Sequence, residues 1–420
     1  MSDPAPDTAP VVAPPPGHPR FPLIDSLRAI AALSVLLTHT AFVSAAILNP
    51  TYGAYAARLE LGVTLFFLIS GFLLYRPFVS ARLNGAPKPA VRDYARRRLL
   101  RIVPAYWFAL TVLALWPGLN GVFTGHWWAY YFFLQIYNNN WVLGGIGPAW
   151  TLCVEMSFYF LLPLYAAGLA WLLRPVSRAM QVRAELAVLG AMFISSLALR
   201  SWLRVHDTTS WMLNALPTHM DWFSVGMALA VVSAALQGAQ RTPRAVAVIV
   251  RWPALCWIGA GVAFWAVSRH VYGPQGVDVF GHLVLEYTER NDLWRHVLYA
   301  GVAAGLLVPA VIGGDRRDGV VRRILSWRVL AWLGLVSYGI YLWQAPVFTW
   351  ICEPSPHPAC VIHHVGEFSR HPFFWLTLFT AIVVVSTAAF SYYVVERPFL
   401  RLKNRRLLHR MRRRIAPARA

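Results

Sequence analysis

Residues 23–46 read LIDSLRAIAALSVLLTHTAFVSAA, an apolar stretch whose only ionisable side chains are Asp25, Arg28 and His39. As a helix, this stretch is long enough to cross about 30 Å of hydrocarbon. Nine more stretches of comparable length follow, near residues 61–80, 99–117, 150–172, 186–204, 216–237, 252–268, 294–312, 330–351 and 373–396. The pattern predicts an all-α polytopic membrane protein with about ten transmembrane helices.

The distribution of charge predicts how these helices are oriented. Only 13% of the 420 residues are charged, against about 25% in soluble domains. Of the 38 Lys and Arg residues, 31 lie in alternate gaps on the side of the chain ends, and seven lie on the other side. The positive-inside rule then predicts cytoplasmic N- and C-termini in a multi-pass protein of the inner (plasma) membrane. Because topology explains the net charge of +20, we expect the lipid bilayer as a partner and no nucleic acid.

Composition divides the chain into three segments. Residues 1–20 are rich in proline and lack the pattern of a cleavable signal peptide, which predicts a disordered cytoplasmic tail. Residues 21–400 are expected to form the transmembrane domain. Residues 401–420 are expected to form a basic cytoplasmic tail, whose charge would attract anionic lipid headgroups.

The first apolar stretch carries its ionisable residues on one face. Arg28 and His39 are eleven residues apart, so at about 100° per residue their side chains point in nearly the same direction, and Asp25 lies one turn before Arg28. An ionisable group at a helix centre costs roughly 2.5 kcal/mol or more in a bilayer, so the shared face favours a polar cavity. The alternative is an arginine that reaches the interface and a hydrogen-bonded structural histidine.

Two carboxylates lie near the outer ends of later stretches. Glu155 follows Trp150 by five residues, and Asp221 stands at the start of another apolar run. A carboxylate at this depth could orient or charge-balance an imidazole such as His39, which makes both residues candidates for catalysis. The alternatives are a helix-packing hydrogen bond for Glu155 and an interfacial cap without chemistry for Asp221.

Basic residues gather at the inner end of the third stretch. Arg98 and Arg101 are neighbours on a helical face and could together hold a phosphate, although topology alone would also place a basic run here. Glu396, which precedes Pro398 at the inner end of the last stretch, is expected to need a cation. These features favour a charged cytosolic substrate.

No metal site or permanently bound cofactor is expected. The four cysteines match no zinc or redox spacing, and the histidines between residues 357 and 364 have no fixed ligand pattern. Pairing of Cys352 with Cys360 stays open, because it depends on an oxidising environment.

Six short motifs follow one another along the chain. They are Arg28 to His39 with ten intervening residues, Phe66-Phe-Leu-Ile-Ser-Gly-Phe72, Arg98-Leu-Leu-Arg101, Trp150-Thr-Leu-Cys-Val-Glu155, Gly334 to Trp343, and Ser391-Tyr-Tyr-Val-Val-Glu396-Arg-Pro398. In this order they resemble the acyltransferase-3 family of membrane acyl-CoA-dependent O-acyltransferases, in its stand-alone form without a fused hydrolase-like domain. One position departs from the family: Gln344 stands where relatives often have a histidine, and glutamine cannot titrate.

The resemblance implies a reaction and a role for each matching residue. An acetyl or other short acyl group would move from cytosolic acyl-CoA to a hydroxyl of a cell-surface polysaccharide, a lipid-linked sugar or a secondary metabolite such as a macrolide. His39 would be the general base, oriented by Glu155 or Asp221, or would carry the acyl group itself. The residues that bind acyl-CoA or the acceptor would be Arg28, Arg98, Arg101, Tyr106, Trp150, Ser337, Tyr338 and Glu396.

Two other classes of function are compatible with the same apolar pattern. A secondary transporter or a flippase of a lipid-linked sugar would also have about ten helices and midplane charges, but the sequence contains no internal repeat. A non-catalytic membrane scaffold would leave the shared face of Arg28 and His39 without a purpose. Release of free thiol from acyl-CoA distinguishes the enzyme from both.

Overall fold

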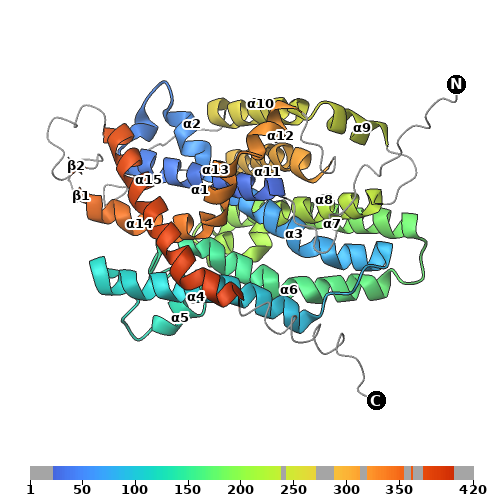
Figure 1. Cartoon of the computed structure of the whole chain (residues 1–420), viewed down its shortest axis with the longest axis horizontal. Helices are drawn as coiled ribbons and strands as arrows, with labels where there is room; N and C mark the ends of the chain where they lie inside the picture. The colour runs from blue at the N-terminus through green and yellow to red at the C-terminus, as the bar shows by residue number, and fades with distance from the viewer. Residues whose placement is uncertain are drawn as a thin grey trace, which may run out of the picture.

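The computed structural model describes residues 22–237, 243–270, 288–312, 319–353, 361–362 and 372–401. The predicted tails, residues 1–20 and 401–420, lie outside these ranges except for residue 401. Most of the long helices run side by side, roughly along the long axis of the molecule (Figure 1). The prediction of an all-α polytopic membrane protein is therefore confirmed.

Eight helical segments among the described residues are long and apolar enough to cross a bilayer. Their principal helices are α1 (Pro22–Val43), α3 (Gly62–Asn84), α4 (Val91–Leu113), α6 (Trp150–Leu172), α7 (Arg178–His206), α8 (Met220–Leu236), α11 (Glu289–Val311) and α15 (Pro372–Ser391). Shorter helices complete the described chain: α2 (Gly53–Arg58), α5 (Trp127–Tyr131), α9 (Arg244–Arg251), α10 (Ala254–His270), α12 (Val320–Leu325), α13 (Arg328–Leu335) and α14 (Ser337–Ile351). Two-residue strands, β1 (Cys352–Glu353) and β2 (Val361–Ile362), pair antiparallel.

Each of the ten predicted stretches contains a helix, but one stretch is broken. The run 330–351 forms α13 and α14, and the chain between them leaves the helical path at Val336. The Ser337 hydroxyl donates a hydrogen bond to the Gly334 carbonyl at 2.8 Å, which satisfies a backbone acceptor at the break. Hydropathy cannot detect such a break, because the residues on both sides of it are apolar.

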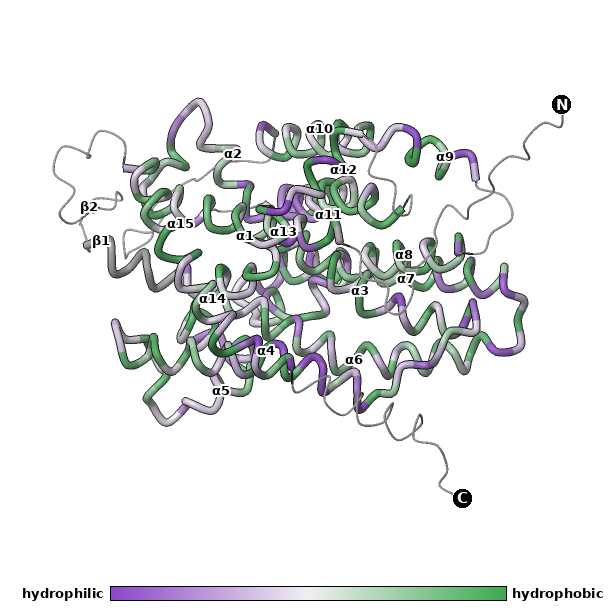
Figure 2. Tube along the Cα trace, in the orientation of Figure 1, coloured by the Kyte–Doolittle hydropathy of each residue, from purple (hydrophilic) through white to green (hydrophobic). Residues whose placement is uncertain are grey.

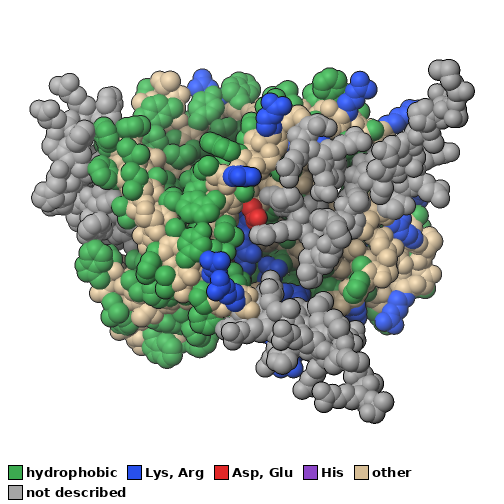
Figure 3. All heavy atoms as spheres, viewed as in Figure 1, with side chains coloured by type: hydrophobic (Ala, Val, Ile, Leu, Met, Phe, Trp, Pro, Cys, Tyr) green, Lys and Arg blue, Asp and Glu red, His purple; other side chains and the backbone are tan. Residues whose placement is uncertain are grey.

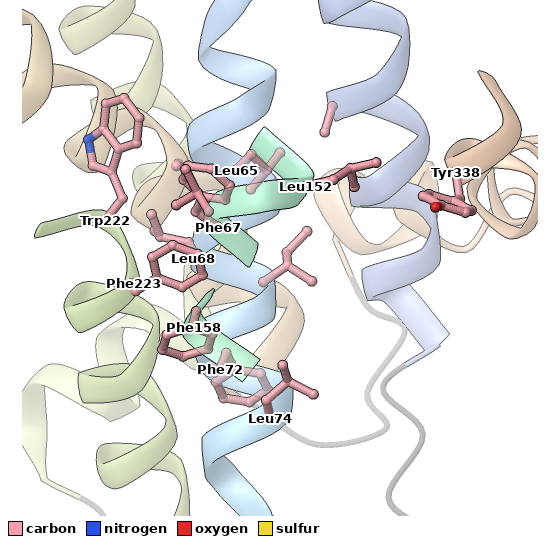
Figure 4. Close-up of a cluster of buried hydrophobic side chains, with 14 of the residues drawn as sticks. Leu65, Phe67, Leu68, Phe72, Leu74, Leu152, Phe158, Trp222, Phe223 and Tyr338 are labelled. Carbon is pink, nitrogen blue, oxygen red and sulfur yellow. The ribbon is translucent and has the colours of Figure 1, made fainter. Parts of the chain in front are cut away.

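The core of the bundle is built around α3, which packs against α8 through glycines. A Cβ atom on Gly226 would lie 2.1 Å from the Leu68 carbonyl oxygen, so only glycine permits this backbone approach. Next to this contact, the Phe223 ring stacks on Phe67 at 4.7 Å and on Phe158 of α6 at 4.1 Å between centroids (Figure 4). These contacts fix α3, α6 and α8 relative to one another.

Helix α1 packs just as closely on the opposite side of α3. A Cβ on Gly62 would lie 2.3 Å from the Ala31 carbonyl oxygen. A Cβ on Gly334 of α13 would lie 1.7 Å from the Asp25 carbonyl oxygen. The hydropathy of the trace shows hydrophilic segments within the bundle, near α1, α4 and α11, flanked by apolar segments (Figure 2). Polar groups therefore lie inside the helical bundle, where the sequence predicts a cavity.

Candidate active site

A cavity lies between α1, α3, α4, α6 and α14. It holds about 750 Å³ of space free of atoms, part of it open to the outside. Its polar and ionisable lining residues are Arg28, Ser70, Arg98, Arg101, Thr151, Glu155, Tyr159, Tyr338 and Tyr341. Its apolar lining includes Phe66 and Phe67. Near the middle of one face of the molecule, Lys or Arg side chains gather beside a carboxylate at the edge of a largely apolar surface (Figure 3).

Three arginines face this cavity from two helices. Arg28 comes from the first turns of α1, and Arg98 and Arg101 come from the first half of α4. Within the part of the chain that the structure describes, none of these guanidinium groups has a hydrogen bond or an ion pair with a carboxylate. Guanidinium groups that no carboxylate binds directly keep donors available for a ligand, so this end of the cavity is suited to an anion such as a phosphate.

Glu155 lies on the cavity wall, where neighbouring hydroxyls hold it. Ser70 of α3 donates to its Oε1 at 2.5 Å, and Tyr159, one turn along α6, donates to its Oε2 at 3.1 Å. Arg28 and Arg101 lie within electrostatic range of this carboxylate. The structure therefore brings together Arg28, Arg98, Arg101 and Glu155, which the sequence placed on three different spans.

His39 is not among the residues that line the cavity. Thr151, Phe66 and Tyr341 line one end of the cavity. The rings of Phe66 and Tyr341 pack edge to face at 6.1 Å between centroids, and the hydroxyl oxygens of Thr151 and Tyr341 are 2.7 Å apart. Gln344 lies one helical turn beyond Tyr341, about 4.5 Å along α14, and its amide is within hydrogen-bonding reach of the His39 imidazole. The imidazole thus lies near the end of the cavity that Tyr341 lines, and its catalytic role stays a prediction.

Asp221 lies away from His39 and has a different imidazole as its partner. Its Oδ2 accepts a hydrogen bond from Nδ1 of His296 on α11 at 2.7 Å, and both side chains are buried. The Trp222 ring stacks on this imidazole at 4.2 Å. In this geometry Asp221 cannot also orient His39, so any catalytic role for this carboxylate remains a prediction of the sequence alone.

The remaining predicted binding residues occupy different environments. Tyr338 lines the cavity and donates to the Ile102 carbonyl at 2.9 Å. Glu396 is buried within electrostatic range of Arg101 and Arg28, which agrees with the expectation that it needs a cation.

Three others do not line the cavity. Tyr106 donates to the Tyr130 carbonyl at 3.0 Å, Trp150 packs against His219 at 5.4 Å, and Ser337 stabilises the break between α13 and α14.

A polar network that sequence reasoning missed lies at the predicted outer end of the bundle. It joins Glu60, Arg200, Arg204, Asp292, Arg295 and Tyr299 through side-chain hydrogen bonds. A signal for it was present, because Arg200, Arg204 and Arg295 lie within predicted apolar stretches, where a charged side chain needs a partner. Which of these residues pair with one another could not be predicted, since the partners are far apart in sequence.

Among the described residues, no group of three or more His, Cys, Asp or Glu side chains could hold a metal ion. Cys352, Cys360 and the histidines between 357 and 364 lie outside the side chains that the structure describes.

Fold and site together define a polytopic membrane protein with an arginine-lined cavity among its helices. A family model described as acyltransferase domain (Acyl_transf_3) matches residues 21–396. The chain belongs to this acyltransferase family, as the order of its motifs predicted.

Three curated relatives are similar along most of this chain. It is 24% identical to the putative peptidoglycan O-acetyltransferase YrhL of Bacillus subtilis over 94% of its length, and 23% identical to the peptidoglycan O-acetyltransferase OatA of Listeria monocytogenes over 78%. These matches cover 58% and 49% of the two relatives, so the chain spans about half their length. Nodulation protein 10 of Rhizobium leguminosarum bv. viciae is 26% identical, with 92% of this chain and 95% of that protein covered. No solved structure gives a significant match.

Proposed function

We propose that this protein is an O-acyltransferase of the inner (plasma) membrane that moves a short acyl group from cytosolic acyl-CoA to a hydroxyl of a glycan. The observation that carries the proposal is the group of three arginines at one end of a cavity among the helices, none of them in a direct ion pair with a carboxylate of the described chain. Positive-inside topology puts this end at the cytosolic side, where acyl-CoA is available. Names of two relatives favour an acetyl group and a cell-wall glycan as the acceptor.

Arg28, Arg98 and Arg101 would hold the CoA phosphates through charge-assisted hydrogen bonds. The pantetheine arm would extend past Ser70 and Glu155 toward the end of the cavity at Phe66 and Tyr341. Tyr338 would contact this arm from α14, and Glu396 would limit the positive charge around the arginines. For the thioester to reach His39, the edge-to-face contact of Phe66 with Tyr341 has to open.

The transfer itself would need one base. The His39 imidazole would take the proton of the acceptor hydroxyl while that oxygen attacks the thioester carbonyl carbon. The carbon–sulfur bond then breaks, the acyl group remains on the acceptor oxygen, and the thiolate of CoA recovers the proton from the imidazolium. Gln344 would hold the imidazole by a hydrogen bond without taking part in proton transfer, since an amide does not titrate.

The break between α13 and α14 is one observation in favour of a transporter, because transporters often use discontinuous helices near their binding sites. Production of thiol distinguishes the two functions. We expect purified protein with acetyl-CoA and a peptidoglycan fragment to release free CoA and ester-linked acetate in a one-to-one ratio. The measurement is thiol titration together with mass spectrometry of the fragment. Uptake of the glycan into vesicles without any thiol release would instead establish transport.

A further inference from the structure

The network at the predicted outer end of the bundle is a continuous chain of ion pairs. Asp292, which is 1% exposed, accepts from Arg200 at 2.6 Å and from Arg204 at 3.0 Å. It also accepts from Arg295 of its own helix at 2.6 Å. Buried ion pairs are stable only when they are hydrogen-bonded in good geometry. The three arginines and the Asp292 carboxylate therefore hold one another in place.

Glu60 forms the end of this chain that is nearest to α1. Its Oε1 accepts from Arg295 at 2.9 Å and from the Tyr299 hydroxyl at 3.0 Å. Unlike Asp292, this carboxylate is one-third exposed, at 33%. Arg295 and Tyr299 of α11 therefore hold the accessible Glu60 carboxylate in one position.

The backbone that carries Glu60 is packed against α1 on both sides of the residue. Before it, the Ala57 carbonyl accepts from the Thr38 hydroxyl at 3.3 Å, one residue from His39. After it, Gly62 meets the Ala31 carbonyl so closely that no side chain would fit. Glu60 is the carboxylate that lies within electrostatic range of the His39 imidazole.

We propose that Glu60 is the positioning residue of His39, fixed by Arg295 and Tyr299 so that its charge faces the imidazole. This inference rests on the proposed function, in which His39 is the base. When the imidazole accepts the proton of the acceptor hydroxyl it becomes a cation, and a carboxylate already in place stabilises that cation without reorganisation. Glu155 and Asp221, the carboxylates predicted for this role, have other partners: the hydroxyls of Ser70 and Tyr159, and His296.

Glu60→Gln removes the charge and keeps the size of the side chain. We expect kcat to fall about 10- to 100-fold, the usual cost of losing a group that orients a functional histidine. KM for acyl-CoA should stay within about twofold of wild type, because the arginines that would hold the phosphates are unchanged. Glu60→Asp keeps the charge and should recover most of the lost turnover, which a purely structural role would not produce.

Glu185→Gln is the matched control, since Glu185 is also a carboxylate held by an arginine and a tyrosine, Arg82 and Tyr75, but on another part of the bundle. It should lower the melting temperature and leave kcat per folded molecule unchanged. Equal losses of kcat in Glu60→Gln and Glu185→Gln would overturn the inference, as would a loss in Glu60→Asp as large as in Glu60→Gln.

A double-mutant cycle separates this inference from the function on which it rests. If Glu60 acts through His39, adding Glu60→Gln to His39→Ala should cause no further loss of residual turnover. A full additional loss would show that Glu60 acts by another route, with His39 still the base. Near-normal turnover in His39→Ala would instead remove the proposed base, whatever Glu60 does.

Discussion

His39→Ala should lower acyl transfer by about 10²- to 10⁴-fold, the range that a general base contributes. The physical reason is that a sugar hydroxyl is a weak nucleophile until a positioned base takes its proton. Steady-state release of CoA from acetyl-CoA, with a glycan fragment as the acceptor, measures the loss. KM for acetyl-CoA should change little, because His39 is not among the residues that line the cavity that would hold the donor.

His206→Ala is the control for this substitution. His206 is exposed at the end of α7, where its ring stacks on Trp202 at 5.0 Å, and it should be replaceable without loss of turnover. If the two alanine variants were equally active and equally folded, the chemistry would have to be assigned to another group. Glu155 would then be the next residue to replace, since it is the carboxylate that lines the cavity.

The second large effect is expected from Arg98→Gln combined with Arg101→Gln. Each charge-assisted hydrogen bond contributes about 1.5–3 kcal/mol, so loss of both arginines should weaken acyl-CoA binding by at least about 100-fold. Isothermal titration with CoA measures this directly, and titration with dephospho-CoA shows how much of it depends on the 3′-phosphate. Weaker binding should appear mainly in KM, with kcat at saturation changed less.

Arg92→Gln combined with Arg97→Gln supplies the matched control. Both residues belong to the basic start of α4 but do not line the cavity, so this pair removes the same charge from the same helix. CoA affinity in the control should stay within about threefold of wild type. If both double variants lost affinity equally, general electrostatic attraction would explain binding, and the specific phosphate site would be wrong.

Much of the fold could be predicted because a bilayer constrains sequence strongly. Each apolar stretch, from residues 23–46 to 373–396, contains a helix, since lipid leaves no other partner for the backbone polar groups. The break at Val336 could not be predicted, because it depends on the close approach of Gly334 to the Asp25 backbone. That contact joins segments about 300 positions apart, which periodicity does not reveal.

The candidate site was predictable in part for a similar reason. Arg98 with Arg101 follows from helical phase, and Arg28 was expected to help them. Glu155 was expected beside His39 but lines the cavity within electrostatic range of Arg28 and Arg101. The partners of the carboxylates were not predictable. His296 is 75 positions from Asp221, and Arg295 is 235 positions from Glu60. Such pairs are decided by how α2, α8 and α11 pack, and helical phase within one span carries no information about them.

The position of His39 is the other feature that sequence could not give. Helical phase puts Arg28 and His39 on one face, but it does not reveal that Arg28 lines the cavity whereas His39 does not. The Phe66 and Tyr341 rings, which pack edge to face, can separate by rotation about χ1, so we expect this contact to open when the donor binds.

A structure of the purified protein with a non-hydrolysable acyl-CoA analogue bound would test the central claim most directly. We predict that the phosphates lie within about 2.9 Å of Arg28, Arg98 and Arg101, and that Phe66 and Tyr341 have separated. The carbonyl carbon of the analogue should then lie where an acceptor oxygen bonded to the His39 imidazole could approach to about 3–3.5 Å. Phosphates bound elsewhere, or aromatic rings still closed between the acyl group and the imidazole, would contradict the account.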